Sequence, residues 1–301
     1  MTAATPATRP GIDKANLAVR VGSALVFAVF FFTLLYQGAQ PWAKAVFLGV
    51  LALAAAMGVH ELTLMGRKLG HNPSFPAGTL AAWGILVHFF LVGRDVTDPL
   101  PLWAVLAFGA IVIHFGALFF DRDLDKALTS QAITWMGALY MGLGTGFIMK
   151  LFMFTETTLS NTGGRLVLAL FLITWMGDTT AYFVGSLLGR HKLARRVSPK
   201  KSWEGALGNL AGNVAAAFVI RAFVCVQWTA VDAVAIGLLL GTAGQLGDLA
   251  ESTWKRSAGV KDSNMGSISI PGHGGMLDRL DSLAFAAPVF YAYVHFVHGL
   301  N

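Results

Sequence analysis

Polar side chains recur at helical spacing in a part of the chain that is otherwise apolar. Four of them share one face of a predicted helix: Asp248, Glu251, Ser252 and Lys255. The apolar run Ala233–Leu246 precedes them directly, so Asp248 has little chain in which to leave a membrane. Ionisable groups at membrane depth are costly and usually serve a site. We therefore predict a functional site here; a solvated helix end with a salt bridge is the simpler alternative.

A second pair of carboxylates, Asp278 and Asp281, stands at i and i+3 where the last apolar segment begins. Two carboxylates on one face suit a hard divalent cation, and the start of a helix also stabilises negative charge. They follow the glycine-rich stretch Pro271–Gly275, whose backbone can approach a ligand closely and present N–H groups to phosphate. We predict a metal site, with simple helix-capping charge as the alternative for a single aspartate.

The opposite charge comes from an earlier basic segment, which Asp178 precedes. Its lysines and arginines are closely spaced: Arg190, Lys192, Arg195, Arg196, Lys200 and Lys201. Asp178 follows an apolar run and is a further intramembrane carboxylate. Lys200 and Lys201 stand at the predicted membrane boundary, so we predict that they bind phosphate. A positively charged cytoplasmic loop is the simpler account of Arg195 and Arg196.

The composition is that of a membrane protein. Hydrophobic residues make up 55% of the 301 residues and charged residues 13%, whereas a soluble domain is about a quarter charged. The net charge of +6 fits loop lysines and arginines that face anionic headgroups. Without an RNA-binding motif or a separate basic domain, we predict the membrane as a partner and no nucleic acid. The single Cys225 excludes an internal disulfide framework.

Nine hydrophobic segments are long enough to cross a bilayer as helices, so we predict an all-α polytopic membrane protein. They are 17–36, 43–63, 77–93, 101–120, 133–154, 166–188, 206–228, 232–254 and 280–298. We divide the chain into a disordered cytoplasmic tail, 1–16, an N-terminal transmembrane scaffold, 17–165, and a catalytic transmembrane region, 166–301. Ser198–Glu204 has the turn residues of a helix entry. Glu61, at the end of the second segment, is a weaker candidate for a site.

The distribution of lysine and arginine predicts the orientation. With the N-terminus in the cytoplasm, most of the 22 basic residues fall on the cytoplasmic side; the exceptions are Lys44, Arg94, Lys150, Arg165 and Arg221. Both charged segments then face the cytoplasm, where nucleotides are available. Carboxylates for a divalent cation, together with lysines for phosphates, predict metal-assisted phosphoryl or nucleotidyl transfer to a lipid.

Two blocks of motif carry a family resemblance. The longer block comprises Gly247–Arg256 (GDLAESTWKR), Gly259–Ser263 (GVKDS) and Pro271–Ser282 (PGHGGMLDRLDS). The other comprises Asp178–Phe183 (DTTAYF), Gly189–Leu193 (GRHKL) and Ser198–Gly205 (SPKKSWEG). Over about residues 174–283 the chain resembles the phosphatidate cytidylyltransferases, the CDP-diacylglycerol synthase family; the N-terminal half matches only in hydropathy.

The resemblance implies the reaction of CTP with phosphatidate to give CDP-diacylglycerol and diphosphate in phospholipid biosynthesis. It implies Mg²⁺, with K⁺ as a candidate second cation, a homodimer, and a bacterial inner membrane. It also implies Asp248, Asp278 and Asp281 as metal ligands and, with Lys255, as catalytic residues. The motif positions implied to bind substrate are Lys200, Lys201, Ser202, Trp203, Glu204, Glu251, Ser252, Arg256, Lys261, Asp262, His273, Gly274, Gly275, Arg279 and Asp178.

The segment Ser263–Ile270 departs from the family pattern because it is longer, which leaves the accepted lipid open. A cytidylyltransferase for another lipid phosphate is therefore one alternative. A CDP-alcohol phosphotransferase is disfavoured, since its Asp-Gly-x-x-Ala-Arg pattern is absent. A transporter, or a catalytically idle homologue with a scaffold role, is the non-enzyme alternative, and the GHGGMLDRLD arrangement is hard to explain on that interpretation.

Overall fold

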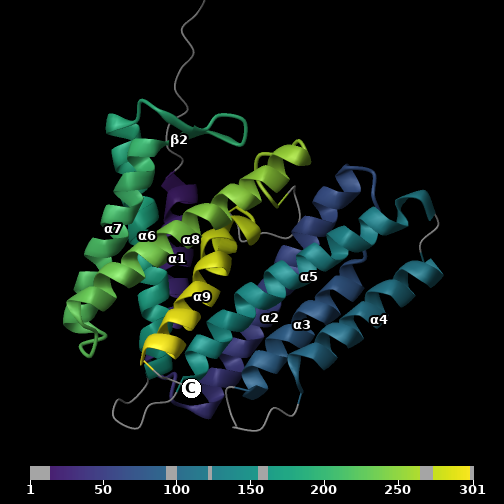
Figure 1. Ribbon diagram of the computed structural model, residues 1–301, viewed down its shortest axis with the longest axis horizontal. Helices are drawn as coiled ribbons and strands as arrows, with labels where there is room; N and C mark the ends of the chain where they lie inside the picture. The colour runs from purple at the N-terminus through teal and green to yellow at the C-terminus, as the bar shows by residue number, and fades with distance from the viewer. Residues whose placement is uncertain (1–13, 93–99, 121–123, 155–161, 265–273, 299–301) are drawn as a thin grey trace, which may run out of the picture.

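A computed structural model describes residues 14–92, 100–120, 124–154, 162–264 and 274–298, and these residues are almost entirely helical (Figure 1). The helices are α1 (Lys14–Tyr36), α2 (Pro41–Lys68), α3 (Phe75–Val92), α4 (Leu102–Phe120), α5 (Leu124–Met153), α6 (Thr162–Leu188), α7 (Trp203–Phe223), α8 (Ala230–Ser257) and α9 (Leu277–His298). In this described part, all but α1 are long and apolar enough to cross a membrane, and α1 is apolar over Leu25–Tyr36. The predicted all-α membrane fold is confirmed.

The boundary of the predicted tail needs a correction. Helix α1 begins at Lys14, so the last residues of the segment 1–16 are helical. Residues 1–13 lie outside the described residues, and the disorder predicted for them stays a prediction.

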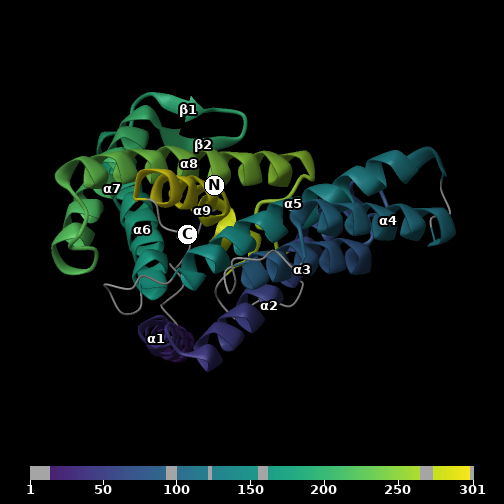
Figure 2. The same cartoon turned by 60° about the horizontal axis from the view of Figure 1, so that its bottom comes forward.

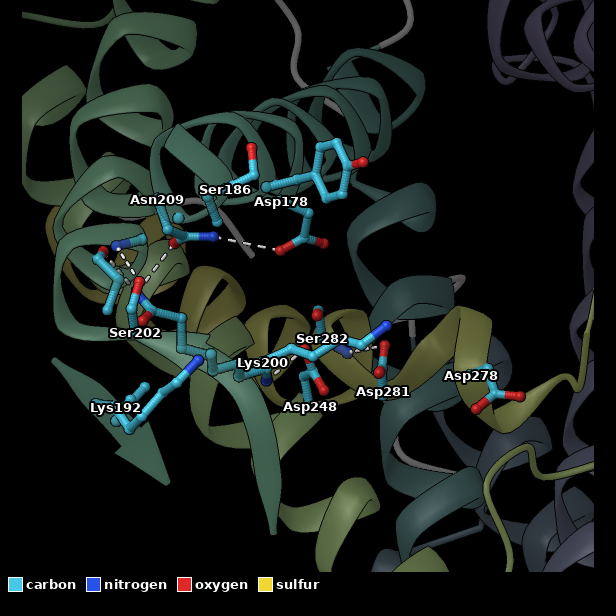
Figure 3. A pocket seen from close by; sticks show the side chains of 18 residues that line it. Asp178, Ser186, Lys192, Lys200, Ser202, Asn209, Asp248, Asp278, Asp281 and Ser282 are labelled. Carbon is cyan, nitrogen blue, oxygen red and sulfur yellow. Dashed lines mark hydrogen bonds and ion pairs between the residues drawn. The ribbon is translucent and has the colours of Figure 1, made fainter. Parts of the chain in front are cut away.

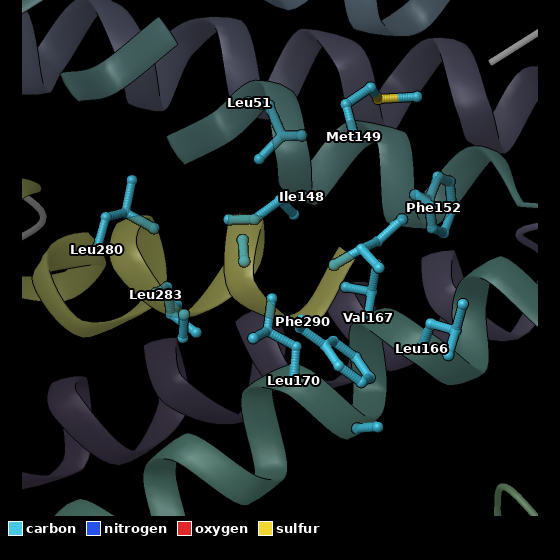
Figure 4. Packing of buried hydrophobic residues seen from close by; sticks show 14 of the residues in the cluster. Leu51, Ile148, Met149, Phe152, Leu166, Val167, Leu170, Leu280, Leu283 and Phe290 are labelled. Atoms are coloured by element: carbon cyan, nitrogen blue, oxygen red, sulfur yellow. The ribbon is translucent and has the colours of Figure 1, made fainter. Parts of the chain in front are cut away.

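One large apolar cluster joins the predicted scaffold to the predicted catalytic region. Helix α5 packs against α2, α3, α4, α6 and α9. Figure 4 shows Phe290 of α9 beside Leu170 of α6; both belong to one buried apolar cluster with Phe152 of α5. Large side chains on the outside are also apolar, such as Phe115 on α4. That surface suits contact with lipid rather than water.

Helices α6 to α9 pack closely in sequence order, α6 on α7, α7 on α8 and α8 on α9. A two-stranded antiparallel hairpin, β1 (Lys192–Ala194) and β2 (Ser198–Ser202), lies between α6 and α7 in the chain. In Figures 1 and 2 this hairpin lies at one end of the bundle, beside α8. The hairpin therefore covers the end of the helices that carry the predicted site.

The helix entry predicted in Ser198–Glu204 lies at the end of that segment. Helix α7 begins at Trp203, and the Ser202 hydroxyl accepts a hydrogen bond from the Gly205 N–H at 3.1 Å, which caps the helix. The strand β2 before it was not predicted. Its polar residues carry no alternation of apolar side chains, so pairing with β1 is what satisfies the backbone groups.

The segments that the sequence assigns to one membrane face adjoin one another in the structure. The Lys68 ammonium at the end of α2 donates to the Gly259 carbonyl at 3.0 Å. The Arg256 guanidinium at the end of α8 donates to the Val197 carbonyl of the hairpin at 3.1 Å. The ends of α2 and α8 and the hairpin thus form one surface, with the C-terminal end of α9 at the opposite end of the bundle (Figure 1).

Candidate active site

A cavity of about 620 Å³ opens between the hairpin and helices α6 to α9 (Figure 3). Its volume lies in the range of small-molecule sites, about 300–1,000 Å³. Helices α6, α8 and α9 line it with four aspartates: Asp178, Asp248, Asp278 and Asp281. The hairpin lines it with three lysines: Lys192, Lys200 and Lys201. The cavity therefore sets anionic helix ends against a cationic cover.

Asp248 and Asp281 both line this cavity because α8 and α9 approach each other closely at Gly247. A Cβ atom at Gly247 would overlap the carbonyl oxygen of Asp281. The glycine before Asp248 is therefore what lets α8 lie directly on the first turns of α9. In Figure 3 both carboxylates point into the same space, and Asp278 lies beyond Asp281. The Lys201 ammonium lies 2.5 Å from Asp248 Oδ2.

Asp178 is held opposite by a cluster of amide side chains. The Asn209 Nδ2 group donates to Asp178 Oδ1 at 3.3 Å (Figure 3). The Asn209 Oδ1 atom accepts from Asn213 Nδ2 at 2.7 Å and from Gln245 Nε2 at 3.1 Å, which fixes the orientation of its amide. This cluster ties α6, α7 and α8 together. Sequence reasoning missed it, although amides within apolar segments were a usable signal.

Lys255 lies in a buried ion triad. Its ammonium is 2.5 Å from Glu251 Oε2 and 2.5 Å from Asp278 Oδ1. The Glu251 side chain is fully buried and that of Lys255 is 12% exposed, so the salt-bridge alternative describes this pair, but in a buried setting. Neither Lys255 nor Glu251 is among the described residues that line the cavity. Their contact with substrate stays a prediction.

Of the four aspartates that line the cavity, Asp278 has the most polar contacts. Its Oδ2 atom accepts from the Ser263 N–H and the Gly275 N–H, both at 3.1 Å, and lies 3.0 Å from the Ser263 hydroxyl. Its Oδ1 atom faces Lys255. The helix-capping alternative is thus realised in part, while Asp278 also borders the cavity.

The other predicted substrate-binding residues lie around the site in different ways. The Ser252 hydroxyl donates to Asp248 Oδ1 at 3.3 Å. The Glu204 carboxylate accepts from the Arg190 and His191 N–H groups, which closes the base of the hairpin. The Arg256 guanidinium holds the Val197 and Val260 carbonyls. The residues that are exposed and outside the described cavity lining are Trp203, Lys261, Asp262, Gly274 and Arg279. His273 lies outside the described residues.

The carboxylates of the described cavity lining are suitable ligands for magnesium, but they are not gathered around a common point. Carboxylate oxygens are the ligands that Mg²⁺ prefers. Among the described residues, no three acidic, histidine or cysteine side chains are gathered closely enough to hold an ion. Asp248 faces Lys201 and Asp278 faces Lys255 instead. A cation bound here would compete with Lys201 for Asp248 and with Lys255 for Asp278.

One carboxylate that supports the site comes from the N-terminal region. Glu61 of α2 is buried and accepts hydrogen bonds from the Ser263 hydroxyl and from the Met276 and Leu277 N–H groups at the start of α9. Sequence reasoning ranked it low because no motif surrounds it. Its position in an apolar segment was the signal that could have raised it.

Comparison with known proteins identifies the family of this chain. The profile of the cytidylyltransferase family matches residues 18–297. A phosphatidate cytidylyltransferase of Staphylococcus aureus (strain COL) is 32% identical over 274 residues, which cover 91% of this chain and 97% of that protein. The proteins of the same name from Staphylococcus epidermidis and Staphylococcus saprophyticus are 31% identical over 277 residues (91% and 97% covered) and 36% identical over 215 residues (70% and 76% covered). The chain therefore belongs to the cytidylyltransferase family.

Proposed function

We propose that this protein transfers the cytidylyl group of CTP to phosphatidate, giving CDP-diacylglycerol and diphosphate. The observation that carries the proposal is the cavity in which aspartates of three helices face hairpin lysines, at one end of a bundle with an apolar outer surface. The names of the relatives support the choice of CTP and phosphatidate among nucleotides and lipids. An exposed apolar surface beside the cavity suits a substrate with acyl chains in the bilayer.

The chemistry asks mainly for charge neutralisation and alignment. A phosphate oxygen of phosphatidate attacks the α-phosphorus of CTP, a new P–O–P bond forms, and the bond to the β-phosphate breaks with release of diphosphate. The attacking phosphate is already ionised, so no strong general base is needed. The obstacle is the approach of two anions. Lys192, Lys200 and Lys201 lie where they would neutralise the phosphates and hold them in line.

A divalent cation such as Mg²⁺ would supply further neutralisation of charge on the leaving diphosphate. Asp248 and Asp281 are the residues that would hold it, because their carboxylates share one space. Asp278 belongs to the same proposed set if it gives up its contact with Lys255. Asp178, which accepts a hydrogen bond from Asn209, is a further carboxylate in the wall of the cavity. The second cation and the homodimer stay predictions.

We place the cavity on the cytoplasmic side of a bacterial inner membrane. The distribution of lysines and arginines supports this orientation. The joining of the ends of α2, α8 and the hairpin into one surface supports it as well. CTP would then reach the cavity from the cytoplasm while phosphatidate arrives from the bilayer.

The test uses the purified full-length protein in detergent micelles. CTP, Mg²⁺ and phosphatidate are supplied together, and diphosphate release and CDP-lipid are measured. We expect both products, with neither formed when phosphatidate is omitted. Folded protein that releases no diphosphate in the presence of phosphatidate would contradict the proposal.

A related lipid phosphate is the second candidate for the acceptor. The segment Ser263–Ile270, which is longer than the family pattern, is the reason to test other lipid phosphates. Its first residue, Ser263, contacts Asp278 beside the cavity. Residues 265–270 lie outside the described residues. A competition panel of lipid phosphates, assayed at fixed CTP, separates the two. Faster turnover of another lipid phosphate than of phosphatidate would replace the acceptor and leave the nucleotidyl transfer in place.

A further inference from the structure

A buried carboxylate of the N-terminal region is bonded entirely to the catalytic region. The Glu61 side chain on α2 is 1% exposed. Its Oε2 atom accepts from the Ser263 hydroxyl at 2.7 Å and from the Leu277 N–H at 2.9 Å. Its Oε1 atom accepts from the Met276 N–H at 2.7 Å. A buried carboxylate without donors would be strongly destabilising, so these three bonds define its role in the fold.

Glu61 does for α9 what a local capping residue does for other helices. Helix α9 begins at Leu277 after Gly274, Gly275 and Met276, none of which carries a side-chain oxygen. The first N–H groups of a helix have no partner within it. Two of them donate to Glu61, and the Gly275 N–H donates to Asp278. The start of α9 is thus fixed from α2.

The close approach depends on a glycine. A Cβ atom at Gly275 would overlap the Ser263 hydroxyl and lie 2.8 Å from Glu61 Oε2. A side chain there would have to displace the Ser263 hydroxyl and crowd the Glu61 carboxylate. This gives Gly275 a reason to be glycine that does not involve a phosphate ligand.

The bonds of Glu61 lead to the carboxylates of the cavity. The Ser263 hydroxyl lies 2.7 Å from Glu61 Oε2 and 3.0 Å from Asp278 Oδ2. Asp281 follows one turn later on the same helix and lines the cavity. A shift of the first turn of α9 would therefore move both aspartates together.

We propose that Glu61 is a positioning residue of this enzyme, which holds the first turn of α9 so that Asp278 and Asp281 stand where nucleotidyl transfer requires them. The proposal rests on the proposed function for its kinetic consequences. Its structural consequence, the anchoring of Met276 and Leu277, is independent of activity. Glu61 is not among the described residues that line the cavity, so it would act on the site through α9.

The substitution Glu61→Gln separates positioning from bulk. Glutamine has the same shape, but one acceptor oxygen becomes an amide donor that faces backbone or hydroxyl donors. We expect kcat to fall about 100-fold, since a displacement of about 1 Å has that effect on an aligned reaction. We also expect the Mg²⁺ concentration for half-maximal activity to rise about 10-fold or more, as with other supports of metal ligands. Glu61→Asp keeps the charge and should recover part of both losses.

The control is the neighbouring residue His60, which packs edge-on against Phe75 of α3 with ring centroids 5.1 Å apart. His60→Gln changes the same stretch of α2 without touching the start of α9. A merely structural role for Glu61 would lower the amount of folded enzyme, and hence the maximal rate. It would leave the Mg²⁺ dependence and the kcat per folded molecule unchanged.

Amide hydrogen exchange of the substrate-free protein gives the readout that does not depend on activity. We expect Met276 and Leu277 to exchange faster in Glu61→Gln than in the wild type and in His60→Gln. Wild-type exchange at these amides, together with wild-type Mg²⁺ dependence, would overturn the proposal. If Glu61→Gln does not fold, Glu61→Asp takes its place: its shorter side chain must speed exchange at Met276, and unchanged exchange overturns the proposal. An inactive wild type would contradict the proposed function alone, because the exchange result still decides the role of Glu61.

Discussion

The two halves of the bundle use charge in opposite ways. Helices α6, α8 and α9 direct aspartates into a common cavity, and the lysines of the hairpin face them there. Helices α1 to α5 contribute no described residue to the cavity lining. Two of them nevertheless make polar contacts with α9, which carries two of the cavity aspartates. Glu61 of α2 holds the start of α9, and the Tyr140 hydroxyl of α5 donates to the Asp281 carbonyl at 3.3 Å. The scaffold therefore reaches the site through polar groups that contact the first turns of α9.

This contrast explains how an apolar half can matter to a charged site. Packing of α5 on α9 fixes where the helix lies, because buried apolar side chains from both form one cluster. Packing alone does not fix the first turn of a helix, whose N–H groups need acceptors. Polar groups of α2 and α5 act at that end of α9. Matched pairs of substitutions can test this contrast. Each pair changes one residue at the site and one similar residue away from it.

The largest difference should appear between two aspartates. Asp281→Asn should lower kcat about 1,000-fold, because the cavity loses a carboxylate that neutralises or holds the reacting charge. Asp125→Asn makes the same change at an exposed position in the first turn of α5 and should leave kcat unchanged. Initial rates of CDP-lipid formation, normalised to folded protein, measure both. Full activity of Asp281→Asn would remove Asp281 from the reaction.

A second pair compares two lysines for stability. Lys255→Met leaves Glu251 and Asp278 without their shared cation, and breaking a buried ion pair costs about 3–5 kcal/mol. Lys68→Met loses one exposed hydrogen bond to the Gly259 carbonyl, worth about 1 kcal/mol. Thermal unfolding in detergent should show a large fall in Tm for the first and a small fall for the second. If Lys255→Met lowered the Tm as little as Lys68→Met, the ion triad would contribute little to the stability of the fold.

The third pair lies within the hairpin and sharpens the boundary of the site. Lys200 lines the cavity, whereas Arg196 is exposed and outside the described lining. Lys200→Met should raise the KM for CTP about 10-fold, since a hydrogen bond to a charged group is worth about 1.5–3 kcal/mol. Arg196→Met should leave that KM unchanged. An equal rise in both variants would mean that the hairpin acts through its overall charge.

Much of this arrangement was predictable from sequence because apolar length and motif spacing are local properties. The helices, the shared face of Asp248 and Ser252, and the opening of the last helix near Asp278 follow from such patterns. The hairpin was not predicted, since β1 and β2 are short and polar and have no periodicity.

The contacts of Glu61 could not be predicted for a different reason. Its partners Ser263, Met276 and Leu277 stand about 200 residues later in the chain, and only tertiary packing brings them to α2. One partner of Lys255 could not be predicted for the same reason. Its spacing to Glu251 was visible, but its contact with Asp278 required the packing of α8 on α9.

The smallest expected effect tests whether every scaffold contact with α9 matters equally. Tyr140→Phe removes only the hydroxyl, because phenylalanine keeps the ring contact with Trp254, whose centroid lies 4.8 Å away. The lost bond to the Asp281 carbonyl is long, at 3.3 Å. We expect a loss of stability of about 0.5–1.5 kcal/mol and a fall in kcat of less than about 10-fold.

Tyr293→Phe is the matched control for this last prediction. The Tyr293 hydroxyl donates to the carboxylate of Asp232 at 2.7 Å, about three turns further along α9 from Asp281. Because the acceptor is charged, its loss should lower stability more, by about 1.5–3 kcal/mol, while kcat stays unchanged. If Tyr293→Phe loses more stability while Tyr140→Phe loses more kcat, the Tyr140 contact from α5 acts on the site and not only on the fold. If Tyr140→Phe lowered kcat as far as Glu61→Gln, the hydroxyl of α5 would share the positioning role, and the support of α9 would be divided between two scaffold helices.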